Sequence, residues 1–248
     1  MKKICFKNLD ITINSGELIS VIGPNGSGKT IFLKKVCGRL NNDDIFIDDK
    51  NINKYDIEYK KNKIACVFDD NIYNSQTPKE ELKYYLEKLN IDNDVIINRL
   101  NDFIEFFDLE EIIDKNFLEL CTEERIFIKI LSLLIIVPAL FCIDDLLTYL
   151  NKDKKMKILN YIKDKSITLL CVTSNMDDVL LFDKILVINK GRRELFDKAS
   201  IVLQKDDVFK ELGLSLPFIY DINNMLKSYD LINEDHIVYR ELVDLLWK

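Results

Sequence analysis

The sequence predicts an α/β fold with a mostly parallel sheet, and three features indicate it. Apolar strand-like runs alternate with helical patterns from residue 17 to residue 190, which is typical of a sheet with helices on both faces. The run ELISVIG at 17–23 leads through a glycine-rich loop into a helical pattern. A second apolar run, ALFCIDD at 139–145, ends in two aspartates. The 248 residues are enough for one large domain, or for one domain with an appendage.

The glycine-rich loop GPNGSGKT matches the P-loop pattern, in which a strand leads through G-x-x-x-x-G-K-T into a helix. It uses three of only seven glycines, so a chance match in a glycine-rich region is a poor alternative. Backbone N–H groups would face phosphates, Lys29 would reach the β- and γ-phosphates, and Thr30 would ligate Mg²⁺. The expected nucleotide-binding residues are Gly23, Pro24, Asn25, Gly26, Ser27, Gly28, Lys29 and Thr30.

The aspartates at 144 and 145 extend this prediction to a metal ion. An apolar strand that ends in an aspartate matches the Walker B pattern, in which Asp144 would hold Mg²⁺ through water. Apolar strands ending in aspartate are common, so the pattern is weak alone. Downstream of a P-loop, the same pattern is a specific indication of a Walker B strand.

Charge and cysteine content restrict the class of protein. The net charge of −7 argues against a general nucleic-acid binder. The six cysteines form no CxxC pair, so neither a zinc site nor a disulfide framework is expected. Cys66, Cys142 and Cys171 lie in apolar runs and are expected to be buried free thiols of a reducing cytoplasm.

No membrane-spanning or secretory segment is expected. The N-terminus lacks the apolar stretch of a signal peptide. The longest apolar run, at 130–143, is shorter than the ~20 residues of a membrane-spanning helix. We expect this run to form a buried helix end, a turn at Pro138 and then a strand.

With both motifs placed, the chain resembles ABC-type ATPases along most of its length. The resemblance implies a P-loop NTPase core with a mostly parallel sheet, an inserted helical subdomain and a C-terminal helical tail. The implied boundaries are 1–200 for the nucleotide-binding domain, about 72–135 for the helical subdomain and 201–248 for the tail. The matching stretches are the Q-loop strand at 63–71, signature to Walker B at 120–145, the D-loop at 146–151, and the switch strand to the final hairpin at 169–192.

The tail at 208–247 is similar to that of energy-coupling-factor (ECF) transporter ATPases, where a Gly-Leu-x-x-Pro stretch leads into helices. The resemblance implies ATP and Mg²⁺ as cofactors, a second ATPase subunit and a transmembrane scaffold as partners, and a cytoplasmic position on the inner face of the membrane. The alternative is an ordinary pair of amphipathic helices that pack on the main domain. The apolar positions expected to contact a partner are Phe218, Ile222, Met225, Leu226, Leu242, Leu245 and Leu246.

The signature segment departs from the family pattern Leu-Ser-Gly-Gly-Gln. Carboxylates near a helix N-terminus suit the helix dipole but are poor neighbours for a γ-phosphate. The loss of two glycines also restricts close approach of the backbone. The alternative interpretation is a capped helix start without a signature role. The signature-like residues are Leu120, Cys121, Thr122, Glu123 and Glu124.

Four other family positions also differ. The catalytic glutamate is Asp145, whose side chain is one methylene shorter, and the switch histidine is Ser174, which cannot become cationic. The only histidine, His236, lies in the tail. The Q-loop glutamine is Asp69, which retains the ability to ligate Mg²⁺ but adds negative charge, and the D-loop aspartate is Asn151. Asp145, Asp69 and Ser174 are therefore expected to be weak catalytic positions.

The front end is expected to be short. The stretch CFKNLDITINSGE matches the strand before the P-loop strand, and the preceding strand, which carries the family's adenine-stacking aromatic, is expected to be missing. Phe6 either takes that role or is a core residue. ATP rather than GTP is therefore implied by the resemblance alone.

These observations predict a chain that holds ATP and turns it over slowly or not at all. The leading hypothesis is the catalytically weak half of a heterodimeric ECF-type importer ATPase. One alternative is a regulatory or structural pseudo-ATPase that binds nucleotide to hold a complex together. A soluble ABC protein without a transporter ranks last, because tandem P-loops and basic patches are absent from the sequence.

Overall fold

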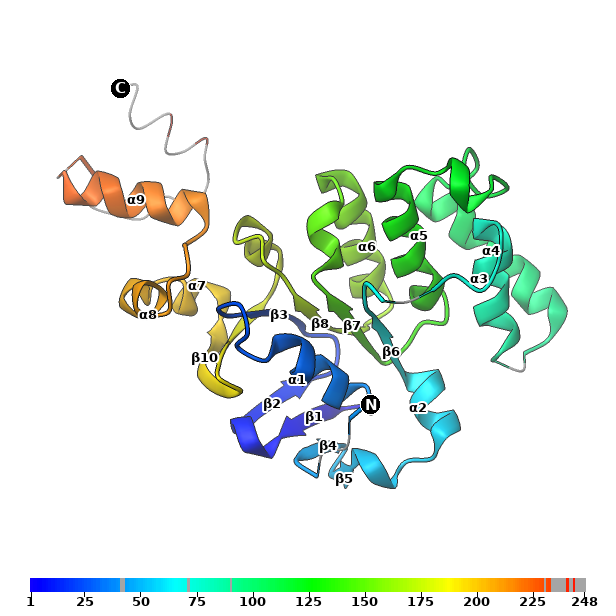
Figure 1. The fold of residues 1–248 in the computed structure, drawn as a ribbon, viewed down its shortest axis with the longest axis horizontal. Helices are drawn as coiled ribbons and strands as arrows, with labels where there is room; N and C mark the ends of the chain where they lie inside the picture. The colour runs from blue at the N-terminus through cyan, green and yellow to red at the C-terminus, as the bar shows by residue number, and fades with distance from the viewer. Residues whose placement is uncertain are drawn as a thin grey trace.

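The computed structural model describes residues 1–40, 43–70, 72–89, 91–229, 231–232, 240 and 243. It contains two β-sheets, a group of helices between β6 and β7, and a group of short helices after the last strand (Figure 1). Of the helices in these ranges, none combines the length and the apolar character that a bilayer-crossing segment needs.

The central sheet has the strand order β10-β9-β3-β8-β7-β6, and all neighbours are parallel except β9 and β10. Every residue of β3 and β8 is buried, as expected for apolar runs covered by helices on both faces. The predicted α/β class is therefore confirmed. The strands are β3 (Leu18–Ile22), β6 (Ile64–Val67), β7 (Leu140–Asp144), β8 (Thr168–Val172), β9 (Lys184–Asn189) and β10 (Arg192–Lys198).

A four-stranded antiparallel sheet with the order β2-β1-β4-β5 corrects the expected front end. The stretch expected to form one strand forms two, because Asp10 adopts a left-handed conformation (φ 49°) after a 3-10 turn and reverses the chain. A strand therefore does precede the one that leads to the P-loop strand. The elements are β1 (Lys3–Phe6), η1 (Lys7–Leu9), β2 (Ile11–Asn14), β4 (Ile45–Ile47) and β5 (Lys50–Asn51).

The helices between β6 and β7 lie at one end of the molecule in Figure 1. The first of them begins with a capping box, in which Thr77 and Glu80 each accept from the other's backbone N–H. An aromatic cluster that includes Phe103, Phe107 and Tyr161 joins this group to α6. The helices up to β8 are α1 (Lys29–Val36), η2 (Ile52–Lys54), α2 (Ile57–Lys63), α3 (Pro78–Glu87), α4 (Asn93–Phe107), η3 (Phe117–Glu119), α5 (Thr122–Leu134), η4 (Leu146–Tyr149) and α6 (Lys152–Asp164).

The segments after β8 are η5 (Asp177–Leu181), α7 (Ala199–Val202), α8 (Asp206–Glu211) and α9 (Phe218–Ser228). Phe209 of α8 is fully buried in a cluster that also includes residues of β9. In α9, Ile219 and Asn223 are buried, whereas Phe218 and Met225 of the predicted apolar stripe are 57% and 56% exposed. The predicted contact residues Leu242, Leu245 and Leu246, and also His236, lie outside the described residues.

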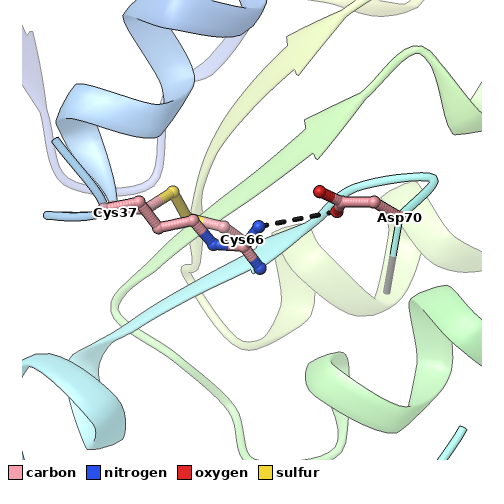
Figure 2. Close-up of a disulfide and its surroundings, with 4 residues drawn as sticks. Cys37, Cys66 and Asp70 are labelled. Atoms are coloured by element: carbon pink, nitrogen blue, oxygen red, sulfur yellow. Dashed lines mark hydrogen bonds and ion pairs between the residues drawn. A yellow bond between two sulfur atoms is a disulfide. The ribbon is translucent and has the colours of Figure 1, made fainter. Parts of the chain in front are cut away.

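The cysteine prediction is wrong for Cys66, which forms a disulfide with Cys37 (Figure 2). Cys37 is the C-cap of α1 and Cys66 lies in β6, so the 29-residue separation gave no local sequence signal. The fold brings their Cα atoms to 6.3 Å, within the range that a disulfide spans. Cys142 and Cys171 are buried free thiols, as expected.

Candidate nucleotide site

The P-loop crosses from β3 to α1 in a conformation that requires its glycines. Gly26 and Gly28 adopt left-handed conformations with φ values of 74° and 101°. A Cβ atom at Gly23 would collide with the carbonyl oxygen of Ile188 at the end of β9. Gly28 is the N-cap of α1, so the unpaired N–H groups of the first helical turn lie at the end of the loop.

Two side chains of the loop are arranged as an anion site requires. The Lys29 ammonium donates to the carbonyl oxygens of Gly23 and Pro24, at 2.7 and 3.0 Å. Burial lowers the pKa of Lys29, and the nearby carboxylates of Asp145 and Asp144 oppose this effect. The Ser27 hydroxyl is buried and has no hydrogen-bond partner among the described residues. The loop therefore offers a cation at the wall of a cavity, which fits a bound phosphate.

Thr30 and Asp144 meet where a metal ion is expected. The Thr30 hydroxyl donates to Asp144 Oδ1 at 3.2 Å, and both residues line a cavity of about 470 Å³. Burial raises the pKa of Asp144, while the hydrogen bond from Thr30 lowers it. Asp69 lines the same cavity. Hydroxyl and carboxylate oxygens beside a P-loop are the ligands that Mg²⁺ prefers, so these residues fit the ion.

Asp145 and Ser174, which the sequence analysis paired as altered catalytic positions, are in contact. Asp145 Oδ1 accepts from the Ser174 backbone N–H at 2.8 Å, from the Ser174 hydroxyl at 2.9 Å and from the Thr148 hydroxyl at 2.9 Å. Asp145 lines the 470 Å³ cavity and adopts a left-handed conformation with φ 58°. Because three protein donors occupy Oδ1, a water molecule would have to be oriented by Oδ2. Thr148 was not identified from the sequence.

Lys129 is a partner of Asp69 that the sequence analysis missed. Its ammonium donates to the Asp69 carbonyl oxygen at 2.9 Å and lies 3.8 Å from the Asp69 carboxylate. The side chain of Lys129 is only 13% exposed, whereas that of Asp69 is 89% exposed. The sequence does contain an indication of this pair, because a single lysine interrupts the apolar run IFIKILSLL of α5. The segment after β6 is thus tied to α5 through a charged pair.

The signature-like segment forms a capped helix start. The Glu124 carboxylate accepts from the Cys121 backbone N–H at 2.8 Å, and the Cys121 sulfur accepts from the Glu124 N–H at 3.5 Å. The hydrogen bond from the Cys121 backbone lowers the pKa of Glu124. Glu123 accepts from the Asn151 N–H at 2.9 Å and lies 3.4 Å from the Lys154 ammonium. Among the residues that line the 470 Å³ cavity, none belongs to 120–124.

Phe6 is a core residue in this structure. It is 1% exposed, and its ring lies 5.1 Å from that of Phe32, measured between centroids. This agrees with the core alternative rather than with an exposed stacking surface. Phe6 does line a second cavity, of about 270 Å³, beside Gly26 and Gly28, but its ring is covered.

Sequence comparisons place this geometry in a known family. A family model described as "ABC transporter" matches residues 6–148. The energy-coupling factor transporter ATP-binding protein EcfA1 of Streptococcus thermophilus is 24% identical over 245 residues, covering 95% of this chain and 89% of the relative. EcfA1 of Mesomycoplasma hyopneumoniae is 26% identical over 256 residues, covering 100% and 93%.

Solved structures share the fold. CbiO1 from Clostridium perfringens, described as part of the ABC transporter complex cbiONQ, matches with a TM-score of 0.72 at 21% identity, over 89% of this chain and 98% of that one. A dimeric ATP-binding cassette in a post-hydrolysis state, bound to ADP and Pi, matches with a TM-score of 0.67 at 19% identity, over 79% and 98%. Because the family model covers more than half of the residues and the P-loop and Walker B groups meet in one cavity, the chain belongs to the ABC transporter ATPase family.

Proposed function

We propose that this chain is the ATP-binding subunit of an ECF-type membrane importer, that it holds Mg-ATP, and that it forms the catalytically weak half of a heterodimer. One observation carries the proposal. The cradle formed by the P-loop, Thr30 and Asp144 is complete, while the Asp145 carboxylate beside it is bound to Ser174. Within one cavity, the groups that would bind Mg-ATP match the family pattern, whereas the carboxylate that would orient water does not.

Nucleotide binding rests on the cation and the free donors of the loop. Lys29 would exchange its two carbonyl partners for phosphate oxygens, which form stronger charge-assisted hydrogen bonds. The α1 N-terminus would add N–H donors to the same phosphates. Thr30 and Asp144 would hold Mg²⁺, with Asp69 as a further oxygen ligand. The ion would neutralise charge on the phosphates.

Slow turnover follows from the groups that would orient water. Catalysis of phosphoryl transfer depends almost entirely on positioning and electrostatic stabilisation. The Asp145 side chain is one methylene shorter than the family's glutamate, and its Oδ1 is occupied by three donors. Ser174 stands where the family has a histidine, and its hydroxyl already donates to Asp145. Misplacement by about 1 Å lowers rates on the order of 10²-fold.

A partner subunit is proposed from the signature-like segment. In an ABC dimer each nucleotide lies between one subunit's P-loop and the other's signature. Here that segment presents Glu123 and Glu124 in place of the family's glycine and glutamine, and both carboxylates are engaged within the chain. A homodimer would carry a weak catalytic site and a weak signature twice. We therefore favour a heterodimer on the cytoplasmic face of the membrane, beneath a transmembrane scaffold.

A structural pseudo-ATPase is the second candidate. Two features of the signature-like segment favour it: the capping box of Cys121 and Glu124, and the hydrogen bond from Asn151 to Glu123. These bonds provide hydrogen-bond partners for the segment within the chain, without a γ-phosphate. This candidate shares nucleotide binding with the first and differs in whether the assembled complex hydrolyses ATP.

The test is to express this chain with the products of adjacent genes, purify the complex and measure ATP hydrolysis. Support for the importer would be co-purification of a second ATPase and a polytopic membrane protein, with activity that falls when the partner's P-loop lysine is replaced. Lys29→Ala in this chain should reduce activity less. A complex that binds ATP through Lys29 but never hydrolyses it would favour the pseudo-ATPase instead.

A further inference from the structure

The disulfide joins two elements that each connect to the nucleotide site. Cys37 is the C-cap of α1, the helix that begins with Lys29 and Thr30. Cys66 lies in β6, three residues before Asp69. Figure 2 shows the bond between the end of the helix and the strand, with Asp70 on the loop that follows the strand. The bond therefore fixes the helix that carries the phosphate cradle to the strand that positions Asp69.

The two bonded cysteines face a cavity large enough for a small reagent. The cavity has a volume of about 480 Å³ and is lined by both of them and by the exposed cations Arg39 and Lys88. Arg39 also pairs with Asp70 at 3.5 Å. Cations near sulfur stabilise thiolates and attract anionic reagents. Access and charge at this cavity thus suit exchange with a small anionic thiol.

The other cysteines of the central sheet are not exposed to this chemistry. Cys142 lies opposite Cys66 in the pairing of β6 with β7, and its sulfur lies within 4.8 Å of the sulfurs of Cys37 and Cys66. It is nevertheless fully buried, and burial raises its pKa. Cys171 is fully buried as well. Of the cysteines in the central sheet, only Cys66 lines the cavity, together with Cys37, while the exposed free thiol of Cys121 is not among the residues that line it.

We propose that Cys37 and Cys66 form a reversible thiol–disulfide site for small anionic thiols and their disulfides, and that its redox state sets how tightly the P-loop holds nucleotide. The effect on nucleotide affinity rests on the nucleotide binding proposed above. Disulfides in cytoplasmic proteins are rare and are usually transient or redox-sensing, so a chain with the proposed cytoplasmic position would not keep this bond merely for stability.

The chemistry is a two-step exchange that balances without a cofactor. A thiolate RS⁻ attacks one sulfur of the Cys37–Cys66 bond, forms a mixed disulfide and releases the other cysteine as a thiolate, which takes up a proton. A second RS⁻ attacks the mixed disulfide at the R sulfur, releases RSSR and leaves the second cysteine reduced. Two electrons pass from two thiols to the protein. The reverse sequence, with RSSR as oxidant, restores the bond.

Reduction would release the end of α1 from β6 without removing any group of the nucleotide site. The relative positions of α1 and β6 would then have to be fixed when nucleotide binds. Binding to a pre-organised site avoids that ordering. We expect Mg-ATP affinity to fall about fivefold or more on reduction, the lower end of typical coupling between sites.

The test equilibrates the full chain in buffers of reduced and oxidised glutathione. One sample of each is unfolded, its free thiols are alkylated and its bonds are mapped by mass spectrometry, and Mg-ATP dissociation constants are measured on folded samples of both forms. We expect four of the six cysteines to be alkylated in the oxidised form and all six in the reduced form, with Cys37 and Cys66 accounting for the difference. The affinity difference should vanish in Cys37→Ser and persist in Cys5→Ser, which replaces a half-buried cysteine outside the pair.

The wild-type chain alkylated at Cys37 and Cys66 while reduced gives the same comparison if Cys37→Ser does not fold. Absence of a Cys37–Cys66 bond, or a bond that glutathione does not reverse, would overturn the site. A reversible bond with equal affinities would overturn the coupling. If neither redox form bound Mg-ATP more tightly than Lys29→Ala, the proposed nucleotide binding would be wrong, and so would the coupling. The bond map would still show whether the Cys37–Cys66 bond forms and reverses.

Discussion

The P-loop and the set formed by Asp69, Asp145 and Ser174 lie around the same nucleotide site but differ in what their polar groups already bind. Lys29 is held by two backbone carbonyls, and the Ser27 hydroxyl has no partner among the described residues. In contrast, Asp145 accepts from Ser174 and Thr148, and the backbone carbonyl of Asp69 accepts from Lys129. The P-loop is arranged to receive a ligand, whereas the second set is bound to other parts of the chain.

This difference separates holding a nucleotide from cleaving it. Binding needs donors and cations at the phosphates, and these groups match the family pattern. Cleavage also needs a water molecule held in line, which depends on the placement of a carboxylate to within a fraction of an ångström. A chain can therefore keep the first function while the groups for the second have changed.

The largest expected effect concerns Lys29, on the P-loop side of the comparison. Lys29→Ala should weaken Mg-ATP binding by at least about 10²-fold, since hydrogen bonds to charged groups contribute about 1.5–3 kcal/mol each and the lysine would reach two phosphates. Titration calorimetry measures this. Lys163→Ala, on the exposed side of α6, is the matched control. Equal affinities of wild type and Lys29→Ala would contradict the claim that the P-loop is the part of the site that holds the nucleotide.

The next largest effect concerns the second set. Asp145→Glu combined with Ser174→His should raise ATP turnover by up to about 10²-fold, because it restores the reach of the carboxylate and a group able to become cationic. We expect this only in a complex whose partner supplies a Leu-Ser-Gly-Gly-Gln-like segment. The isolated double variant is the control. An increase of the same size in that control would show that the signature-like segment is not limiting.

Asp144 tests the metal side of the cradle. Asp144→Asn should weaken Mg-ATP binding by about 10- to 100-fold, the range for groups that hold a metal through its outer shell. Binding of ATP in excess EDTA should change much less, because no ion is then present to be held. Calorimetry with and without Mg²⁺ measures both. An equal loss under both conditions would mean that Asp144 acts on folding or on phosphate rather than on the ion.

The smallest expected effect on nucleotide binding comes from the tail. Truncation after Leu216 removes α9 but keeps Phe209 of α8, which is buried against the central sheet. We expect Mg-ATP affinity to change little and pairing with the second ATPase to weaken, since α9 exposes Phe218 and Met225. Co-purification of the partner with the truncated chain measures this. Unchanged pairing would mean that α9 only packs within the chain.

Much of the central sheet was predictable because its inner strands, such as β3, β7 and β8, are mostly apolar runs. The alternation of such runs with helices predicted the parallel sheet, and the final hairpin follows the NKGR turn between β9 and β10. The β4–β5 hairpin was missed. Its turn uses Asp48 and Asp49 at φ values of 47° and 66°, positions at which Asn-Gly or Gly-Gly would have been easier to recognise.

The site was predictable where a local motif carries the chemistry and not where distant residues meet. The P-loop and the aspartate at the end of β7 were predicted from local motifs that follow apolar runs, and their residues line one cavity. The bonds from Thr148 and Ser174 to Asp145, and the pair of Lys129 with Asp69, depend on the packing of separate elements. The Cys37–Cys66 bond was missed for the same reason, since 29 residues separate its cysteines.

The most direct test of the account is a single-turnover measurement of ATP hydrolysis by the purified chain alone, at enzyme concentrations above the dissociation constant for Mg-ATP. Lys29→Ala provides the baseline. The account predicts that the wild-type chain binds Mg-ATP but hydrolyses it no faster than this variant under matched conditions. Brisk hydrolysis by the wild type that Lys29→Ala abolishes would contradict it, because Asp145, Ser174 and Asp69 would then suffice for catalysis.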